Sequence, residues 1–381
     1  MKTRRNKNQH YIVSFDKYIL LTYCLLCLVG LITLLDISSV QSSLKYFYRQ
    51  LFFGVISIIT AITILYTVNL EKLRVLSPYF VYIAIILLII VLLKGNTVKG
   101  ATRQLSFGFV NFQPSVLARL ALVYYFAHIL DKKNDELVSS NLSQFVVNFL
   151  ALLIVTGITF LLIIMERHLS TLIIGGLTIY GMLIYAGAKK RVLVTIALIG
   201  IIAAGLILAN GADYRKGRLT TYKKFSLFLK PQSEIKIEDS DYQVKESLTA
   251  LSSGGLLGTG IARGRAKHYY LPEARTDYVY SVIGEEWGFL GALIVFGLHC
   301  FLFFRCLWMA NAQENRFLRF LGVGLAMNIF CNVLVNTGVA MSILPPTGNT
   351  LPFISYGGSA LLIDSIALGM LLNISAKRRY V

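Results

Sequence analysis

The chain has 381 residues, of which 56% are hydrophobic and only 15% are charged, and its formal net charge is +18. Soluble globular proteins contain about 25% charged residues, so this composition excludes a cytosolic enzyme, a disordered protein and a collagen-like fibre. The basic residues flank apolar runs and no zinc or RNA-binding motif is present. We therefore expect a membrane protein with no nucleic-acid partner.

Ten apolar runs are long enough to cross a membrane, which takes about 20 residues per helix. In chain order they are residues 18–35, 47–68, 76–93, 113–130, 145–165, 169–187, 192–209, 278–304, 317–338 and 354–375. We predict an all-α polytopic membrane protein, with one ten-helix domain over residues 18–375 and tails at 1–17 and 376–381. The first run has no small-residue cleavage site, so we expect a membrane anchor rather than a cleaved signal peptide.

Lysine and arginine in the loops predict the orientation, because they accumulate on the cytoplasmic side. If the N-terminus is cytoplasmic, the inner segments hold 17 of these residues and the short outer loops hold 6. Both termini are then cytoplasmic and a long loop of about 210–277 lies outside. In that loop, residues 214–231 interleave aromatic and basic side chains, which fits either an interfacial helix or a solvated loop. The glycine-rich residues 252–264 match no nucleotide-binding motif, and we expect their backbone to turn and pack closely.

Ionisable side chains inside the apolar runs are costly and are candidates for function. They are Arg119, His128, His299 and Asp364. Arg119 either faces the bundle interior or extends to the outer headgroups. Asp364, in the last run, either serves function or pairs with a neighbouring helix. We interpret the two histidines as interfacial and the five cysteines as apolar filling.

Residues 271–291 gather Arg275, Asp277, Glu285 and Glu286 at an outer membrane boundary. If the helix begins at 277, Asp277 and Glu285 share one of its faces. A carboxylate beside an arginine suits general-base chemistry on a hydroxyl group, and a helix-start acid favoured by the dipole is the alternative. Further on, residues 336–359 hold three prolines and four glycines. Irregular backbone at membrane depth indicates a re-entrant or cavity-lining loop, and a plain outer loop is the alternative.

These segments together resemble the FtsW/RodA/SpoVE (SEDS) family of bacterial cell-wall proteins over essentially the whole chain. The blocks that carry the resemblance are Gln113-Pro114-Ser115, residues 218–231, Tyr270-Leu271-Pro272-Glu273, Thr276-Asp277, Gly284-Glu285-Glu286, Asn336-x-Gly338 and residues 351–359. Residues 272–274 and 283–286 look more like the division branch, the FtsW-like one, than the elongation branch.

The resemblance implies a peptidoglycan glycosyltransferase of ten spans in the bacterial cytoplasmic membrane, which polymerises lipid II into β-1,4-linked glycan strands on the outer face. Asp277 matches the family's essential acid, Arg49 matches a cavity arginine, and Arg119 stands where the family usually has lysine. We expect further substrate or diphosphate contacts from Lys267, Arg275, Glu166, Glu285, Glu286, Gln113, Ser115 and Ser355. A divalent cation, Mg²⁺ or Mn²⁺, is expected without assigned ligands.

Two acids of the family pattern are missing. Val116 replaces a glutamate, and His168 replaces an aspartate. Either Glu166 or the pair Glu285 and Glu286 compensates, or the missing acids were not part of the chemistry. Because Asp277 is retained, it is the strongest candidate for the catalytic base.

Three functions stay open at this point: glycosyl transfer, transport of lipid II across the membrane, and an inactive scaffold of the division machinery. Transporters place their charges near the membrane midplane, whereas the acids here cluster at the outer boundary. This favours chemistry over transport. The family further implies a class B penicillin-binding transpeptidase as partner, together with other membrane proteins of the division or elongation machinery.

Overall fold

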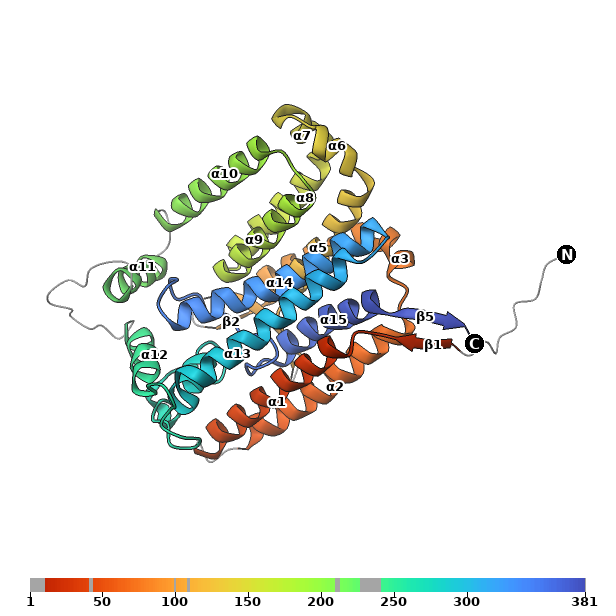
Figure 1. Cartoon of the computed structure of the whole chain (residues 1–381). Coiled ribbons are helices and arrows are strands. Elements are labelled where there is room, and N and C mark those ends of the chain that lie inside the picture. The colour runs from red at the N-terminus through yellow and green to blue at the C-terminus, as the bar shows by residue number, and fades with distance from the viewer. Residues whose placement is uncertain are drawn as a thin grey trace.

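The computed structural model describes residues 11–40, 44–98, 101–107, 110–209, 213–226 and 241–380. Residues 1–10 and 381 of the predicted tails lie outside the described residues, as do residues 210–212 and 227–240 of the predicted outer loop. The long helices run side by side in one bundle (Figure 1). This arrangement confirms the predicted all-α class of a multi-pass membrane protein.

A helix occupies each of the ten predicted apolar runs. The long ones are α1 (Lys17–Val40), α2 (Lys45–Thr67), α4 (Ser77–Lys94), α5 (Pro114–Lys132), α8 (Leu150–Met165), α9 (Leu169–Tyr185), α10 (Lys190–Ala209), α13 (Val279–Asn311), α14 (Arg316–Ala340) and α15 (Gly358–Ser375). Within the described ranges, six helices are long and apolar enough to cross a membrane, or seven if α7 (Leu142–Asn148) and α8 form one span bent by 77°. That ten helices cross the membrane stays a prediction.

Shorter elements connect these helices. They are α3 (Leu70–Leu73), η1 (Arg74–Leu76), α6 (Asn134–Ser139), α11 (Asp213–Phe225), α12 (Tyr242–Ser253) and η2 (Ala266–Tyr270). The chain also forms two small antiparallel sheets, which we did not predict. One contains β2 (Asn96–Val98), β3 (Ala101–Phe107) and β4 (Val110–Phe112), and the other pairs β1 (Tyr11–Ser14) with β5 (Lys377–Tyr380).

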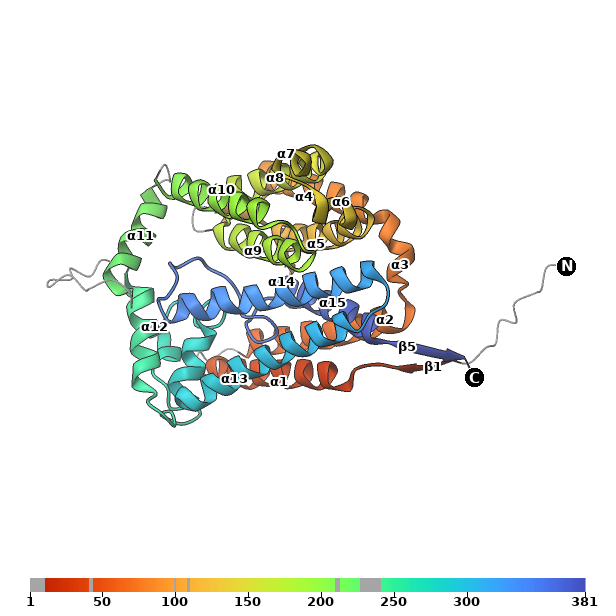
Figure 2. The ribbon, with the colours of Figure 1, turned by 45° about the horizontal axis from the view of Figure 1, so that its top comes forward.

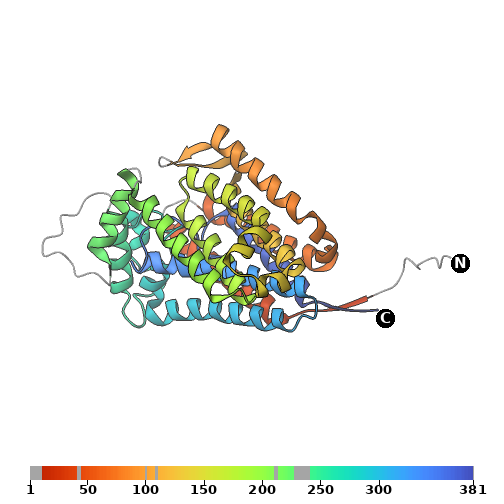
Figure 3. The same cartoon turned by 90° about the horizontal axis from the view of Figure 1, so that it is seen from above.

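The two ends of the bundle differ in what they carry. The β1–β5 pair brings the first and last described segments to one end, and α11 and α12 lie at the opposite end (Figure 1). The same separation is visible after rotation by 45° and by 90° (Figure 2 and Figure 3). The described parts of the predicted outer loop therefore lie at the end of the molecule opposite the first and last described residues.

The outward faces of the helices are apolar, because lipid rather than water is their expected solvent. Ile59 of α2, Ile86 of α4 and Leu161 of α8 are each more than half exposed. Polar groups instead gather inside: Asn332 and Asn336 of α14 are both buried. The interior of this bundle therefore holds the polar groups that a site needs.

Helix α13 is interrupted near its start, where Gly288 adopts a non-helical conformation with φ of 70°. The interruption frees the carbonyl groups of Glu285 and Glu286, which accept hydrogen bonds from the amides of Thr259 (2.9 Å) and Gly260 (3.1 Å). A Cβ atom at Gly258 would lie 2.0 Å from the Glu286 carbonyl oxygen, so only glycine allows this approach. The close backbone packing predicted for residues 252–264 is confirmed.

Candidate functional site

A cavity of about 610 Å³ lies inside the bundle. Its wall includes residues of α11 and α12, so it reaches inward from the end opposite the termini. Four residues that the sequence assigned to the site line it, namely Asp277, Arg49, Arg119 and Gln113. They come from the segment before α13, from α2 and from the beginning of α5, so three separate parts of the chain meet here.

Asp277 is held at the cavity by its backbone. Its amide donates to the Glu273 carbonyl at 3.1 Å, and its carbonyl accepts a hydrogen bond of 2.9 Å from Nδ2 of Asn336. Helix α13 begins at Val279 rather than at 277. The Asp277 carboxylate lies over Gly348, where an added Cβ would be 3.2 Å from Oδ2.

The loop between α14 and α15 forms part of the cavity wall. Its lining residues are Pro346, Gly348, Asn349, Thr350, Tyr356 and Gly357. The Ser355 hydroxyl accepts a hydrogen bond from the Leu351 amide (2.8 Å) and donates to the Thr276 carbonyl (2.5 Å). The predicted cavity-lining loop is confirmed, and Ser355 fastens it to the residue before Asp277 rather than lining the cavity itself.

Four arginines line the cavity wall, together with three acidic side chains. Besides Arg49 and Arg119, it contains Arg103 of β3 and Arg218 of α11, which the sequence did not assign to the site. Arg218 Nη1 donates to the Pro346 carbonyl at 2.9 Å, which joins α11 to the loop before α15. Several guanidinium groups around one cavity are suited to bind a phosphate or diphosphate.

His168 also lines the cavity, but as a neutral ring. Burial lowers the pKa of His168 well below its usual value, and the charges of Arg103, Arg119 and Arg218 lower it further. Its Nδ1 lies 2.9 Å from the Ser115 hydroxyl and 3.1 Å from Nε2 of Gln113. Ser115 therefore supports the histidine from behind, and Gln113 lies both against the histidine and on the cavity wall.

Glu166 follows the last residue of α8 and is fully buried. Burial raises the pKa of Glu166 to about 8, and the Ser115 hydroxyl and the Arg103 guanidinium offset only part of this increase. Glu166 does not line the cavity, whereas Asp364 of α15 does. Of the acids beyond Asp277 that we considered, it is therefore Asp364 that the fold brings to the cavity.

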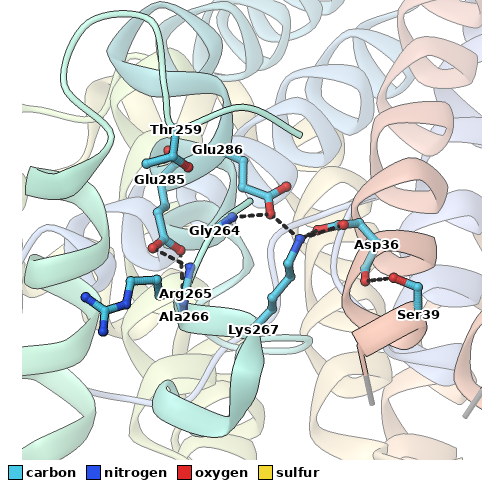
Figure 4. Close-up of polar contacts among 9 residues, drawn as sticks. All are labelled: Asp36, Ser39, Thr259, Gly264, Arg265, Ala266, Lys267, Glu285 and Glu286. Atoms are coloured by element: carbon cyan, nitrogen blue, oxygen red, sulfur yellow. Dashed lines mark hydrogen bonds and ion pairs between the residues drawn. The ribbon is translucent and has the colours of Figure 1, made fainter. Parts of the chain in front are cut away.

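Lys267, Glu285 and Glu286 belong to a separate buried cluster that does not line the cavity (Figure 4). Lys267 Nζ lies 2.7 Å from both carboxylate oxygens of Asp36 in α1 and 2.6 Å from Oε1 of Glu286. Glu285 accepts hydrogen bonds from the Arg265 and Ala266 amides at 2.7 and 3.0 Å. These contacts fasten the segment before Asp277 to α1 and α13. Sequence reasoning missed Asp36, because no local pattern connects it to Lys267.

Arg275 likewise does not line the cavity. Its guanidinium lies 3.9 Å from the centre of the Tyr46 ring, and its carbonyl accepts a hydrogen bond of 2.9 Å from the Tyr356 amide. It therefore connects α2, the segment before Asp277 and the loop before α15.

The expected divalent cation stays a prediction. Within the described ranges, no three His, Cys, Asp or Glu side chains are close enough together to hold a metal ion.

Comparison with known proteins agrees with this architecture. The family profile for FtsW, RodA and SpoVE, described as "Cell cycle protein", matches residues 14–380. A probable peptidoglycan glycosyltransferase FtsW of Geobacter sp. (strain M18) is 31% identical, covering 97% of this chain and 98% of the relative. The stage V sporulation protein E of Bacillus subtilis is 33% identical over 96% and 98%. A probable FtsW of Haemophilus influenzae is 34% identical over 96% and 91%.

Solved structures share the fold. A chain from a study of polymerisation and crosslinking by a peptidoglycan synthase complex matches with a TM-score of 0.77 at 22% identity, covering 95% of this chain and 98% of that one. The rod shape determining protein RodA of Thermus thermophilus matches with a TM-score of 0.69 at 23% identity, covering 95% and 97%. The profile match and the relatives together establish that this chain belongs to the FtsW/RodA/SpoVE family.

Proposed function

We propose that this chain is a peptidoglycan glycosyltransferase that polymerises lipid II, the disaccharide-peptide carried on undecaprenyl diphosphate. Relatives that match nearly its whole length bear the name of this activity. The observation that carries the proposal is that Asp277 shares one cavity with Arg49 and Arg119. An acid and several guanidinium groups in one cavity suit a reaction that removes a proton and releases a diphosphate.

In the proposed reaction, Asp277 acts as general base. The 4-hydroxyl oxygen of the acceptor sugar attacks the anomeric carbon of the lipid-linked donor while Asp277 takes up the hydroxyl proton. The bond from that carbon to the diphosphate breaks, and undecaprenyl diphosphate leaves with the electron pair. Attack from the face opposite the leaving group converts the α-linked donor into a β-1,4 product. This step needs one base and no covalent intermediate on the enzyme.

The arginines of the cavity serve the leaving group. A diphosphate gains negative charge as its bond to the sugar breaks, and fixed guanidinium groups lower the energy of that charge. Arg49 from α2 and Arg119 from α5 approach the cavity from different helices. We assign both to the diphosphate, with Arg103 and Arg218 as further contacts. Gln113 is a neutral contact on the same wall.

The proposed setting is the bacterial cytoplasmic membrane, with both termini in the cytoplasm and the cavity reached from the outer face. The excess of basic residues in the predicted inner segments supports this orientation. It also fits the separation of the termini from α11 and α12. We further propose a class B penicillin-binding transpeptidase as partner, because the new strands require crosslinking.

The test is polymerisation of fluorescent lipid II by the purified chain, with and without a transpeptidase partner. We expect glycan strands from the unaltered chain and none from Asp277→Ala, with both proteins folded in detergent. A parallel assay measures lipid II movement across vesicle membranes. Full activity of Asp277→Ala, or rapid movement of lipid II without any polymer, would contradict the proposal and favour transport.

A further inference from the structure

Arg119 and Asp364 are two ionisable side chains deep in the cavity. Arg119 comes from α5 and Asp364 from α15, and each is only 2% exposed. Both line the cavity, and each is within electrostatic range of the other. Asp364 lies six residues after the start of α15, which is about 9 Å along the helix. This pair therefore lies on an inner part of the wall.

Neither side chain has a direct hydrogen-bond or ion-pair partner within the part of the chain that the structure describes. Arg119 and Asp364 form no ion pair with each other there, and Arg119 Nε is buried without an acceptor. The Lys267 cluster is built differently, since its ammonium group lies 2.6–2.7 Å from two carboxylates. Leaving a buried guanidinium nitrogen without an acceptor is unfavourable. A ligand in the cavity that carries acceptor oxygens can therefore complete the hydrogen bonding of Arg119.

The other charges on the wall explain how Asp364 acts on Arg119. Arg49, Arg103 and Arg218 are like charges that repel the Arg119 guanidinium, and His168 is neutral. Asp277 and Glu273 are the remaining acids of the wall, and both lie in the segment before α13. From α15, Asp364 attracts the guanidinium without occupying its N–H groups. Those donors stay available for a phosphate.

We propose that Asp364 is a positioning residue that directs the Arg119 guanidinium toward the diphosphate of the lipid substrate. This inference rests on the proposed function, because it takes undecaprenyl diphosphate as the leaving group. Asp364 itself does not touch the reacting atoms. It sets the direction and the local field of the cation that does.

Position 116 offers an independent way to supply the same charge. Val116 lines the cavity and precedes Arg119 by three residues on α5. Side chains three residues apart lie on one face of a helix, and an acid at this spacing attracts a basic partner. A glutamate at 116 therefore places a carboxylate next to Arg119 from its own helix. If Asp364 acts through its charge on Arg119, Val116→Glu compensates for its loss.

The experiment compares four purified forms: the unaltered chain, Asp364→Asn, Val116→Glu with Asp364→Asn, and Ser365→Ala. Ser365 is the matched control, since it is buried on the same helix and contacts the Tyr23 hydroxyl at 2.8 Å instead of the cavity. We expect Asp364→Asn to raise the KM for lipid II about tenfold with little change in kcat, as expected for weaker binding. The double variant restores KM to within about threefold. Asp364→Ser carries the same expectation if the asparagine variant is not recovered folded.

Binding of undecaprenyl diphosphate, measured without turnover, separates this inference from the proposed function. Asp364→Asn weakens that binding about tenfold, and binding of uncharged undecaprenol is unchanged. An unaltered chain that binds the diphosphate lipid but makes no polymer would contradict the proposed function alone. The inference is overturned if Asp364→Asn binds the diphosphate lipid as tightly as the unaltered chain. It is also overturned if Val116→Glu fails to restore binding.

Discussion

The side chain of Asn336 donates a hydrogen bond of 2.9 Å from Nδ2 to the backbone carbonyl of Asp277. The same Nδ2 donates to the Asn349 carbonyl at 2.5 Å. One buried amide on α14 therefore holds both the segment that carries the proposed base and the loop that covers it. The position of Asp277 depends on long-range contacts as well as on its own segment.

Replacing Asn336 tests that dependence. Asn336→Ala removes both hydrogen bonds, and we expect activity to fall about 10- to 100-fold, because small displacements of a catalytic group are costly. The measurement is the rate of lipid II polymerisation by protein that is folded in detergent. Asn328→Ala is the control, since Asn328 is buried on the same helix and does not line the cavity. Equal loss of activity in both variants would contradict a specific role for Asn336.

Gly348 provides a second test from the other side of the carboxylate. Its φ is +71°, and a Cβ there would lie 3.2 Å from Asp277 Oδ2. Gly348→Ala both strains the backbone and displaces the carboxylate, so we expect at least a tenfold loss of polymerisation rate (about 1.4 kcal/mol in the barrier). Gly187→Ala is matched in backbone strain, with φ of +84°, and its Cβ would approach Val138 away from the cavity. If Gly348→Ala loses no more activity than Gly187→Ala, the contact with Asp277 is unimportant.

The helices were predictable because long apolar runs have few alternatives in a membrane protein. The cavity was predictable only through the resemblance, since nothing in the local pattern brings Arg49 or Arg119 to Asp277. The contact between Lys267 and Asp36 joins residues 231 positions apart, and local patterns carry no information about such a pair. Asp364 was identifiable as a candidate because it is an ionisable residue inside an apolar run. Its relationship to Arg119 was not predictable from the sequence.

We expect replacement of Lys267 to reduce the stability of the protein strongly. Lys267→Met leaves the carboxylates of Asp36 and Glu286 buried without their cation, which we expect to cost about 3–5 kcal/mol. Thermal unfolding in detergent measures the loss. The control Arg316→Met breaks an exposed contact of 3.4 Å with Asp135 and is expected to change stability by less than about 1 kcal/mol. A Lys267→Met protein as stable as Arg316→Met would show that the cluster does not hold the fold together.

The raised pKa of Glu166 leads us to expect that the stability of the protein depends on pH. Its pKa is raised to about 8 by burial, so the folded state holds its proton more tightly than the unfolded state does. The contribution of the Glu166 proton to the free energy of unfolding is greatest at low pH. It declines as pH rises from about 4.5 toward 8, because above that pH Glu166 is ionised in both the folded and the unfolded state. Glu166→Gln removes this titration. We expect the variant to become progressively more stable than the unaltered chain between pH 5 and about 8, as measured by thermal unfolding. A difference that is constant with pH would show that Glu166 is ionised throughout.

The most direct test of the central claim is the lipid II polymerisation rate of Asp277→Asn, which keeps the shape of the side chain and removes its ability to take up a proton. The control is Glu246→Gln, an acid of α12 that does not line the cavity. We expect kcat of Asp277→Asn to fall about 10²–10⁴-fold, the usual contribution of a general base, and the rate of the control to stay unchanged. An Asp277→Asn protein that polymerises lipid II at the rate of the unaltered chain would contradict the central claim.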